Sequence, residues 1–160
     1  MSRNIIEFGI WKGVPIKWLV LSEDEQKMFL VTESDIFDNC FNPNTQCGNK
    51  WSESEICTKL NSEFYDTAFS ETEKGRIIAS TLSDTDDDTI EKKVFLLSKA
   101  EAKKLLTTEE RSLYFDWWLR NVPPNNTSCA FCVDSDGNFS WNYVRYVYGI
   151  RPAIYLSKPN

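Results

Sequence analysis

The first 34 residues follow a pattern of apolar and polar positions that is typical of β-strands. Apolar side chains recur at every second position through Ile16, Trp18 and Val20, which is the spacing of one face of a strand. A polar stretch at 23–26 separates this run from a second apolar run at 28–32. Two such runs joined by a short polar turn form a hairpin. We therefore expect residues 5–34 to form an antiparallel meander.

The middle of the chain changes to a helical pattern. Ile56, Leu60 and Phe64 lie four positions apart, on one face of a helix. A Ser or Thr followed three residues later by Glu recurs, and this spacing is typical of the capping box at a helix N-terminus. The pattern predicts helices over about 53–64, 71–79, 99–106 and 108–114. The capping pairs are Ser52–Glu55, Ser70–Glu73, Ser98–Glu101 and Thr107–Glu110.

From residue 117 onward the pattern returns to short strands. The apolar runs 131–133 and 139–141 flank a turn that contains Asp-Gly, a strong hairpin signal. Residues 150–156 predict a last strand, in which Pro152 indicates an edge position or an irregular start. The apolar run 94–97 predicts a buried strand before the third helix. We expect an α+β fold in a single domain over 1–160, with antiparallel β-structure and a helical middle.

Composition and charge narrow the possible functions. The 160 residues carry a formal charge of −6, which argues against binding the phosphate backbone of nucleic acids. The chain has no histidine, which excludes Ser-His-Asp and Cys-His catalysis and any His-ligated metal site. It has no apolar run near the ~20 residues that span a bilayer and no signal-peptide pattern. We therefore expect a cytoplasmic protein with no membrane partner and reduced cysteines.

The cysteines and the acidic clusters leave further chemistry open. Cys129 and Cys132 form a C-x-x-C pair that, with Cys40 and Cys47, could supply four thiolates to zinc or act in redox chemistry. However, positions i and i+3 of a strand point to opposite faces, so structural free thiols are favoured. Asp84–Asp88 and Asp134–Asp136 lack the full pattern of a calcium loop. No spacing singles out a carboxylate pair for glycoside hydrolysis. We expect neither a metal nor a cofactor.

Five phrases along the chain resemble, in order, a bacterial domain family of unknown function. Together they extend over about 5–156 and include counterparts of the family's "WWLRS" and "GVRPA" signatures, which here are WWLRN at 117–121 and GIRPA at 149–153. Asn121 stands where that family usually has Ser, which puts any role for a hydroxyl there in doubt. The phrases are Ile16-Lys17-Trp18-Leu19-Val20-Leu21, Leu60-Asn61-Ser62-Glu63-Phe64-Tyr65, Val94-Phe95-Leu96-Leu97-Ser98, Trp117-Trp118-Leu119-Arg120 and Gly149-Ile150-Arg151-Pro152-Ala153.

The same layout more distantly resembles C-type-lectin-like domains, as in sulfatase-modifying proteins and the variable proteins of diversity-generating retroelements. The resemblance rests on a strand-to-helix step before Ser98, the Trp117-Trp118 strand and a closing Gly-x-Arg strand at 149–151. It implies a lectin-like fold.

The last 44 residues hold the strongest candidates for a binding surface. Residues 1–116 carry 14 basic and 22 acidic side chains, whereas residues 117–160 carry four basic and two acidic ones. Aromatic faces, Arg and Asn together suit sugar rings, peptides or carboxylates. Either Arg120 or Arg151 could be a buried residue that ties strands together through carbonyls and carboxylates, and for Arg151 we expect this structural role. The candidate contacts are Trp141, Tyr143, Arg145, Asn142, Asn121 and Arg120.

These residues predict a non-catalytic binding module for a protein or carbohydrate ligand. Two alternatives remain open at this stage. One is a thiol- or metal-dependent protein that uses Cys129 and Cys132. The other is an accessory structural domain with no small ligand. The oligomeric state is left open by the sequence.

Overall fold

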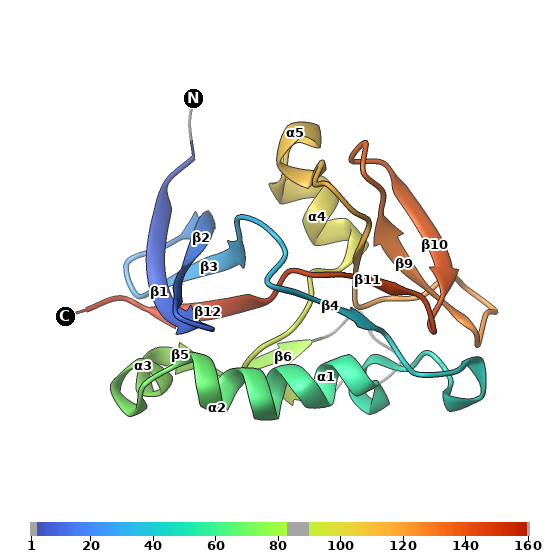
Figure 1. Cartoon of the computed structure of the whole chain (residues 1–160). Helices are drawn as coiled ribbons and strands as arrows, with labels where there is room; N and C mark the ends of the chain where they lie inside the picture. The colour runs from blue at the N-terminus through green and yellow to red at the C-terminus, as the bar shows by residue number, and fades with distance from the viewer. Residues whose placement is uncertain (1–2, 83–89, 160) are drawn as a thin grey trace.

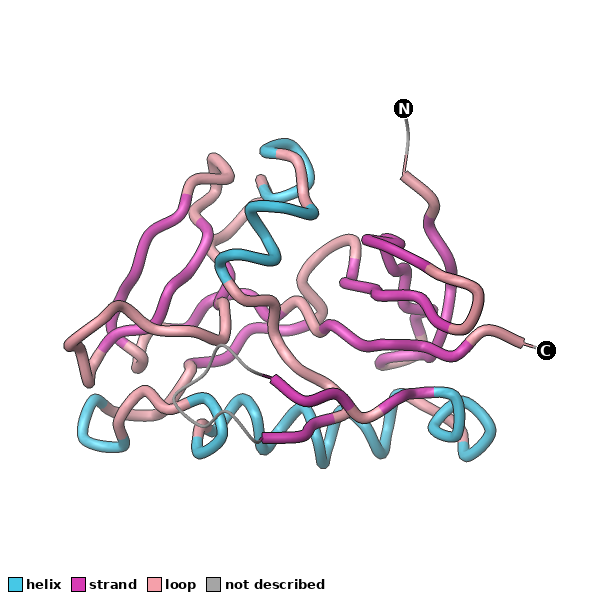
Figure 2. The backbone as a smooth tube through the Cα atoms, turned by 180° about the vertical axis from the view of Figure 1, so that it is seen from behind, coloured by secondary structure: helices cyan, strands magenta, loops and turns pink. Residues whose placement is uncertain are grey.

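Two five-stranded sheets lie side by side above one long helical segment (Figure 1). The computed structural model describes residues 3–82 and 90–159. The strand order is β1-β2-β3-β12-β5 in the first sheet and β10-β9-β8-β11-β4 in the second, and β6 and β7 form a separate pair. The view from behind shows the same helical layer beneath both sheets (Figure 2). The predicted α+β class, with antiparallel strands and a helical middle, is confirmed.

The elements have the following bounds. The strands are β1 (Ile5–Trp11), β2 (Val14–Glu23), β3 (Lys27–Thr32), β4 (Phe37–Cys40), β5 (Ile77–Ile78), β6 (Ser80–Leu82), β7 (Ile90–Lys92), β8 (Trp117–Trp118), β9 (Cys129–Val133), β10 (Phe139–Tyr143), β11 (Val147–Ile150) and β12 (Ala153–Ser157). The helices are α1 (Glu55–Lys59), α2 (Tyr65–Ala68), α3 (Glu71–Arg76), α4 (Lys99–Leu105) and α5 (Thr108–Arg111), with a π-helical turn at Leu60–Phe64 and 3-10 turns at Thr45–Cys47 and Trp51–Glu53. The acidic stretch Asp84–Asp88 lies outside the described residues.

The predicted meander at the N-terminal end is confirmed. Strands β1, β2 and β3 pair antiparallel in sequence order. A register shift between Glu7 and Ile10 bends β1 around Gly9. Gly9 has φ +77°, and a Cβ there would lie 2.6 Å from a ring carbon of Phe69. Only glycine fits this backbone conformation and this close approach, so the bulge depends on it.

The helical segment beneath the sheets begins and ends differently from the sequence prediction. The capping pair Ser52–Glu55 was wrong, because Ser54 caps α1 by accepting a hydrogen bond from the Cys57 N–H. The helix predicted over 71–79 ends at Arg76, since the chain continues as β5 beside β12. A strand partner thus overrides the local helical pattern.

The three other capping boxes are formed as predicted. In each box the Ser or Thr side chain accepts from the Glu backbone, and the Glu side chain accepts from the Ser or Thr backbone. Helix α5 is shorter than predicted and ends at Arg111 rather than near 114. The boxes are Ser70–Glu73 at α3, Ser98–Glu101 at α4 and Thr107–Glu110 at α5.

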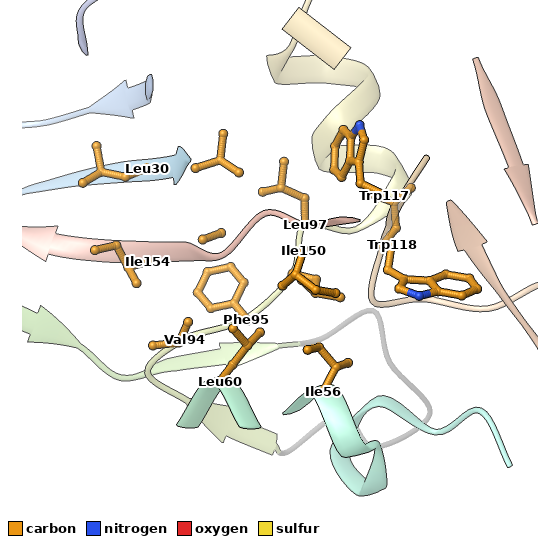
Figure 3. Close-up of a cluster of buried hydrophobic side chains, with 14 of the residues drawn as sticks. Leu30, Ile56, Leu60, Val94, Phe95, Leu97, Trp117, Trp118, Ile150 and Ile154 are labelled. Carbon is orange, nitrogen blue, oxygen red and sulfur yellow. The ribbon is translucent and has the colours of Figure 1, made fainter. Parts of the chain in front are cut away.

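Phe95 lies where both sheets and the helical segment meet (Figure 3). The run 94–97 is buried as predicted, but it forms a single bridge between Phe95 and Ala153 rather than a strand. The last strand begins later than predicted, at Ala153. Pro152 interrupts the chain between β11 of one sheet and β12 of the other. This is the irregular start that the proline indicated.

The N-terminal segment is tied to α5 by an ion pair. The Arg3 guanidinium donates to both carboxylate oxygens of Glu110, with Nε 2.6 Å from Oε2 and Nη2 2.9 Å from Oε1. This partner lowers the pKa of Glu110 to about 2. Hydrogen bonds from the backbone and side chain of Thr107 act in the same direction. Glu110 is therefore charged across the whole pH range in which the protein is handled.

Replacing Glu110 by glutamine is expected to remove a pH-dependent part of the stability. The pKa of this carboxyl is lower in the folded state, so its contribution is complete above the unfolded value of about 4.5 and disappears as the pH falls towards 2. Glutamine can still accept the capping hydrogen bond. At pH 7 the variant should be about 1 kcal/mol less stable in urea unfolding. A stability difference that stays constant from pH 7 to pH 2 would contradict this.

Candidate functional site

Three of the predicted contact residues lie together on β10 and the turn that follows it. Trp141 is 57% exposed and Tyr143 is 45% exposed. The Arg145 guanidinium lies 4.9 Å from the Tyr143 ring centre and 5.0 Å from that of Tyr146. The Trp141 ring packs edge-on against Phe131 of β9, at 6.1 Å. We call this surface the aromatic edge; its members are Phe139, Trp141, Tyr143, Arg145 and Tyr146.

The backbone of β10 is open on its outer side. β10 is the end strand of its sheet and lies at the outside of the molecule (Figure 1). The Val144 N–H donates to the Ser128 C=O. Hydrogen-bonded and non-bonded pairs alternate along an antiparallel ladder, so the register places the backbone groups of Phe139 and Trp141 away from β9.

The other edges of the two large sheets are protected in ways that β10 is not. β1 carries the Gly9 bulge and a charge at Glu7, and β5 is only two residues long. β4 is short, carries Asp38 and lies beside α1, whose Lys59 donates to the Asn39 side chain. Bulges, charges and short strands are the usual means of preventing a sheet edge from pairing with another chain. β10 has none of them, since its sequence is Phe-Ser-Trp-Asn-Tyr.

Positively charged side chains lie against the rings of the aromatic edge and of its neighbour Phe131. Lys99 Nζ lies 4.6 Å from the centre of the Phe131 ring, next to that face. The Arg111 guanidinium lies 4.9 Å from the Phe139 ring centre. With Arg145, three positive charges are in contact with aromatic rings here. The sequence could not place Lys99 and Arg111 at this surface, because they come from α4 and α5.

Asn142 points to the opposite face of β10. Its side-chain amide donates to the Tyr148 hydroxyl at 2.7 Å, and its Oδ1 accepts from the Tyr143 N–H. Burial, and then the nearby Cys132, raise the pKa of Tyr148 to about 12. Asn142 therefore links β10 to Tyr148 of β11 and provides an acceptor for the outward-facing N–H of Tyr143 at the end of β10.

Arg120 and Asn121 lie away from this surface and hold α4 in place. Arg120 is 3% exposed, and its Nη1 donates to the Leu96 C=O and to Glu101 at 2.6 Å. Asn121 Oδ1 accepts from the Lys99 N–H in the first turn of α4. The structure therefore does not bring these two predicted contacts to the aromatic edge.

Arg151 has the structural role that the sequence predicted. It is fully buried, and its guanidinium donates to the carbonyls of Thr32, Glu33 and Glu110. Its charge lies 4.6 Å from the centre of the Trp117 ring. Burial lowers its pKa to about 10, so the guanidinium remains charged at neutral pH.

The five cysteines are free thiols, and three of them are buried. Cys129 and Cys132 are both buried in β9. Burial raises the pKa of Cys132 to about 12 and that of Cys57 to about 11, which keeps these sulfurs in the unreactive thiol form. Within 3–82 and 90–159, no group of three Cys, Asp or Glu side chains is arranged to hold a metal ion.

A cleft that the sequence did not indicate lies between the β1–β2 hairpin and the segment 33–37. Its volume is about 540 Å³, within the usual range for small-molecule sites. We call it the hairpin cleft. Its apolar wall residues are Trp11, Val14, Pro15, Ile16, Ile36 and Phe37, and its polar ones are Lys12, Lys17, Glu33, Ser34 and Asp35.

Two adjacent hollows continue from Asp35 along the surface. The nearer has a volume of about 640 Å³ and shares Ser34 and Asp35 with the hairpin cleft. The farther, of about 320 Å³, lies between Asp116 and Val147. Tyr114 lines both hollows and is 93% exposed. The only sequence signal for it was a pair of large aromatic residues, Tyr114-Phe115, at the end of the helix predicted over 108–114.

A family model described as "Domain of unknown function (DUF6273)" matches residues 18–158. The chain belongs to this family. Comparisons with curated proteins and with solved structures find no match. The match to the DUF6273 model includes the whole aromatic edge, while the hairpin wall of the cleft lies mostly before it.

No helix in the described part of this DUF6273 domain is long and apolar enough to cross a membrane.

Proposed function

We propose that this DUF6273 domain is a non-catalytic binding module that holds an extended segment of a protein ligand along β10. The observation that carries the proposal is an unprotected edge strand with exposed aromatic side chains. A segment added as a further strand takes main-chain hydrogen bonds from Phe139 and Trp141. The rings of Trp141 and Tyr143 give it apolar contact area at a low cost in side-chain entropy.

The charges around β10 favour an acidic segment. Lys99, Arg111 and Arg145 all contact rings on or beside the aromatic edge. Opposite charge speeds the encounter of two partners and selects among them, and added salt weakens this effect. A ligand with Asp or Glu at alternate positions would present its carboxylates to these cations, because alternate residues of a strand share one face.

Two substitutions of Trp141 are expected to separate the contribution of its ring from that of the main-chain hydrogen bonds of β10. A peptide selected from a random displayed library against the native domain serves as the probe. Trp141→Ala should weaken its binding roughly 30-fold, the effect of a central aromatic contact. Trp141→Pro should weaken it further, because proline also removes an outward N–H without breaking the ladder to β9. Binding is measured by fluorescence anisotropy, with the exposed Val147→Ala as the matched control.

Hydrogen exchange tests the binding mode directly. Strand addition should slow exchange at the amides of Phe139 and Trp141, which face outward, while those of Ser140 and Asn142 change little. A peptide that binds without slowing these amides would contradict the proposal. Tight binding by a version of the selected peptide in which every Asp and Glu is replaced by Lys would also contradict the proposal.

A carbohydrate ligand is the second candidate, because an exposed Trp and Tyr can also stack on sugar rings. It would replace the first if a sugar from a glycan array bound in a Trp141-dependent manner with no change in amide exchange. The thiol-dependent alternative has little support, because burial raises the pKa of Cys132. An accessory structural role would be favoured if neither library yielded a ligand.

We also propose that the fold is related to C-type-lectin-like domains and that the protein acts in the cytoplasm. The pairing of β8 with β11 supports the first, because it places the Trp117-Trp118 and Gly149–Arg151 phrases side by side. An experimental structure, compared strand by strand with lectin-like domains, tests it. Five free thiols support a reducing compartment, which cell fractionation tests.

A further inference from the structure

The hairpin cleft combines an apolar wall with Asp35, a carboxylate that forms no direct ion pair within the described residues. The ring centres of Trp11 and Phe37 lie 5.6 Å apart on one side, and Val14, on the opposite strand, is 64% exposed. Asp35 lines the cleft where it joins the adjacent hollow. In the described chain, no lysine or arginine forms an ion pair with this carboxylate.

The surroundings of Asp35 make this carboxylate a site for an external cation. Burial, and then the neighbouring Asp38, raise the pKa of Asp35, while the charge of Arg151 acts in the opposite direction with a smaller effect. The nearest buried cation, Arg151, has its hydrogen bonds directed to the carbonyls of Thr32, Glu33 and Glu110 rather than to Asp35. A half-buried carboxylate with a like-charged neighbour gains free energy when a cation binds beside it.

One further observation concerns the wall of the cleft, and a second concerns the packing of Asp35 against β11, outside the cleft. Trp11 is 8% exposed, and its indole N–H has no acceptor within 3–82 and 90–159. An unsatisfied donor is unusual at a buried position, and this one would be completed by an acceptor such as a water oxygen rather than by an ammonium group. Gly149 leaves room for the Asp35 side chain, since a Cβ there would lie 2.9 Å from the Cβ of Asp35.

Two lysines line the outer part of the cleft but do not neutralise Asp35. Lys12 and Lys17 are exposed. Lys12 Nζ lies over the Trp11 ring, at 5.6 Å from its centre, and Lys17 faces Glu7 across the β1–β2 ladder. The two hollows that continue from Asp35 are lined by no lysine or arginine among the described residues. A cation that reaches Asp35 therefore meets the carboxylates of Asp35 and Asp38, with the charge of the buried Arg151 acting on the same group.

We infer that the hairpin cleft binds a small organic amine, with its apolar body between the hairpin and Phe37 and its ammonium group at Asp35. The cleft volume is ample for one aromatic ring with a short side chain. This site is separate from the aromatic edge, because the two surfaces share no residue.

Phenethylamine and 2-phenylethanol test the inference, because they differ only in carrying an ammonium or a hydroxyl group. Binding to the full chain is followed by NMR chemical shifts of the Val14 and Phe37 amides. Phenethylamine should bind about tenfold more tightly, the contribution of one charge-assisted contact. In Asp35→Asn that preference should disappear. Val14→Arg, at an exposed wall position, should weaken the amine without affecting the fold, by adding bulk and positive charge.

Trp141→Ala separates this site from the proposed function. It should leave phenethylamine binding unchanged, whereas Asp35→Asn should leave peptide binding at β10 unchanged. Equal affinity for the amine and the alcohol would overturn the inference. So would an amine preference that survives Asp35→Asn, or Val14→Arg binding the amine as tightly as the native chain.

Discussion

Replacing Arg151 by methionine is expected to destabilise the folded protein by about 3–5 kcal/mol. The guanidinium makes four hydrogen bonds to three backbone carbonyls, and all of them lie in the interior or at its margin. Methionine fills much of the volume but donates no hydrogen bond. The carbonyls of Thr32, Glu33 and Glu110 would then remain buried without this donor, which costs about 1–3 kcal/mol for each group left unsatisfied.

The matched control is Arg145→Met. Arg145 also lies against aromatic rings, at 4.9 and 5.0 Å, but it is exposed to solvent. We expect this change to shift the free energy of unfolding by no more than about 0.5 kcal/mol. Urea unfolding followed by tryptophan fluorescence measures both variants. Similar unfolding midpoints for the two would show that the buried hydrogen bonds of Arg151 contribute little.

Phe95→Ala is expected to cost about 3–5 kcal/mol through the cavity that it leaves. The ring is fully buried and lies 6.0 Å from the ring centres of both Phe29 and Tyr155. The Arg120 guanidinium lies 5.7 Å from it on another side. Both sheets and the helical segment pack at this point, so few neighbours can move to fill the space (Figure 3).

Phe115→Ala provides the control of the same residue type. Phe115 is 62% exposed, so its removal should change the free energy of unfolding by about 0.5 kcal/mol or less. Phe95→Leu should lie between the two, because leucine leaves a smaller cavity. A loss below about 1 kcal/mol for Phe95→Ala in thermal or urea unfolding would contradict the packing seen around this ring.

Local signals in the sequence predicted the elements that depend on neighbours along the chain. The capping boxes at Ser70, Ser98 and Thr107 need only residues three positions apart, and all three form. The segment after Arg76 joins a sheet through β12, which is about 80 residues away. No local pattern records that pairing, and the predicted helix was therefore too long.

The candidate contact residues also fall into those that the structure places on one surface and those that it places elsewhere. The aromatic and Arg-rich composition of the last 44 residues singled out Trp141 and Tyr143, and both are exposed. Arg120 is buried through hydrogen bonds to Leu96 and Glu101, and no local sequence pattern indicates that these two residues are its neighbours. The walls of the hairpin cleft come from residues 11–17 and 33–37, and no sequence pattern indicates that these two segments lie close together. Such a cavity becomes visible only when the fold is known.

The position of β12 determines when the protein can fold during its synthesis. β12 lies between β3 and β5 in the first sheet, although it comes last in chain order among the described strands of this domain. Until residues 153–157 leave the exit tunnel, β3 has an open edge and the bridge to Phe95 cannot form. A nascent chain therefore exposes the edge of the apolar strand β3 until the last strand of this domain has been made.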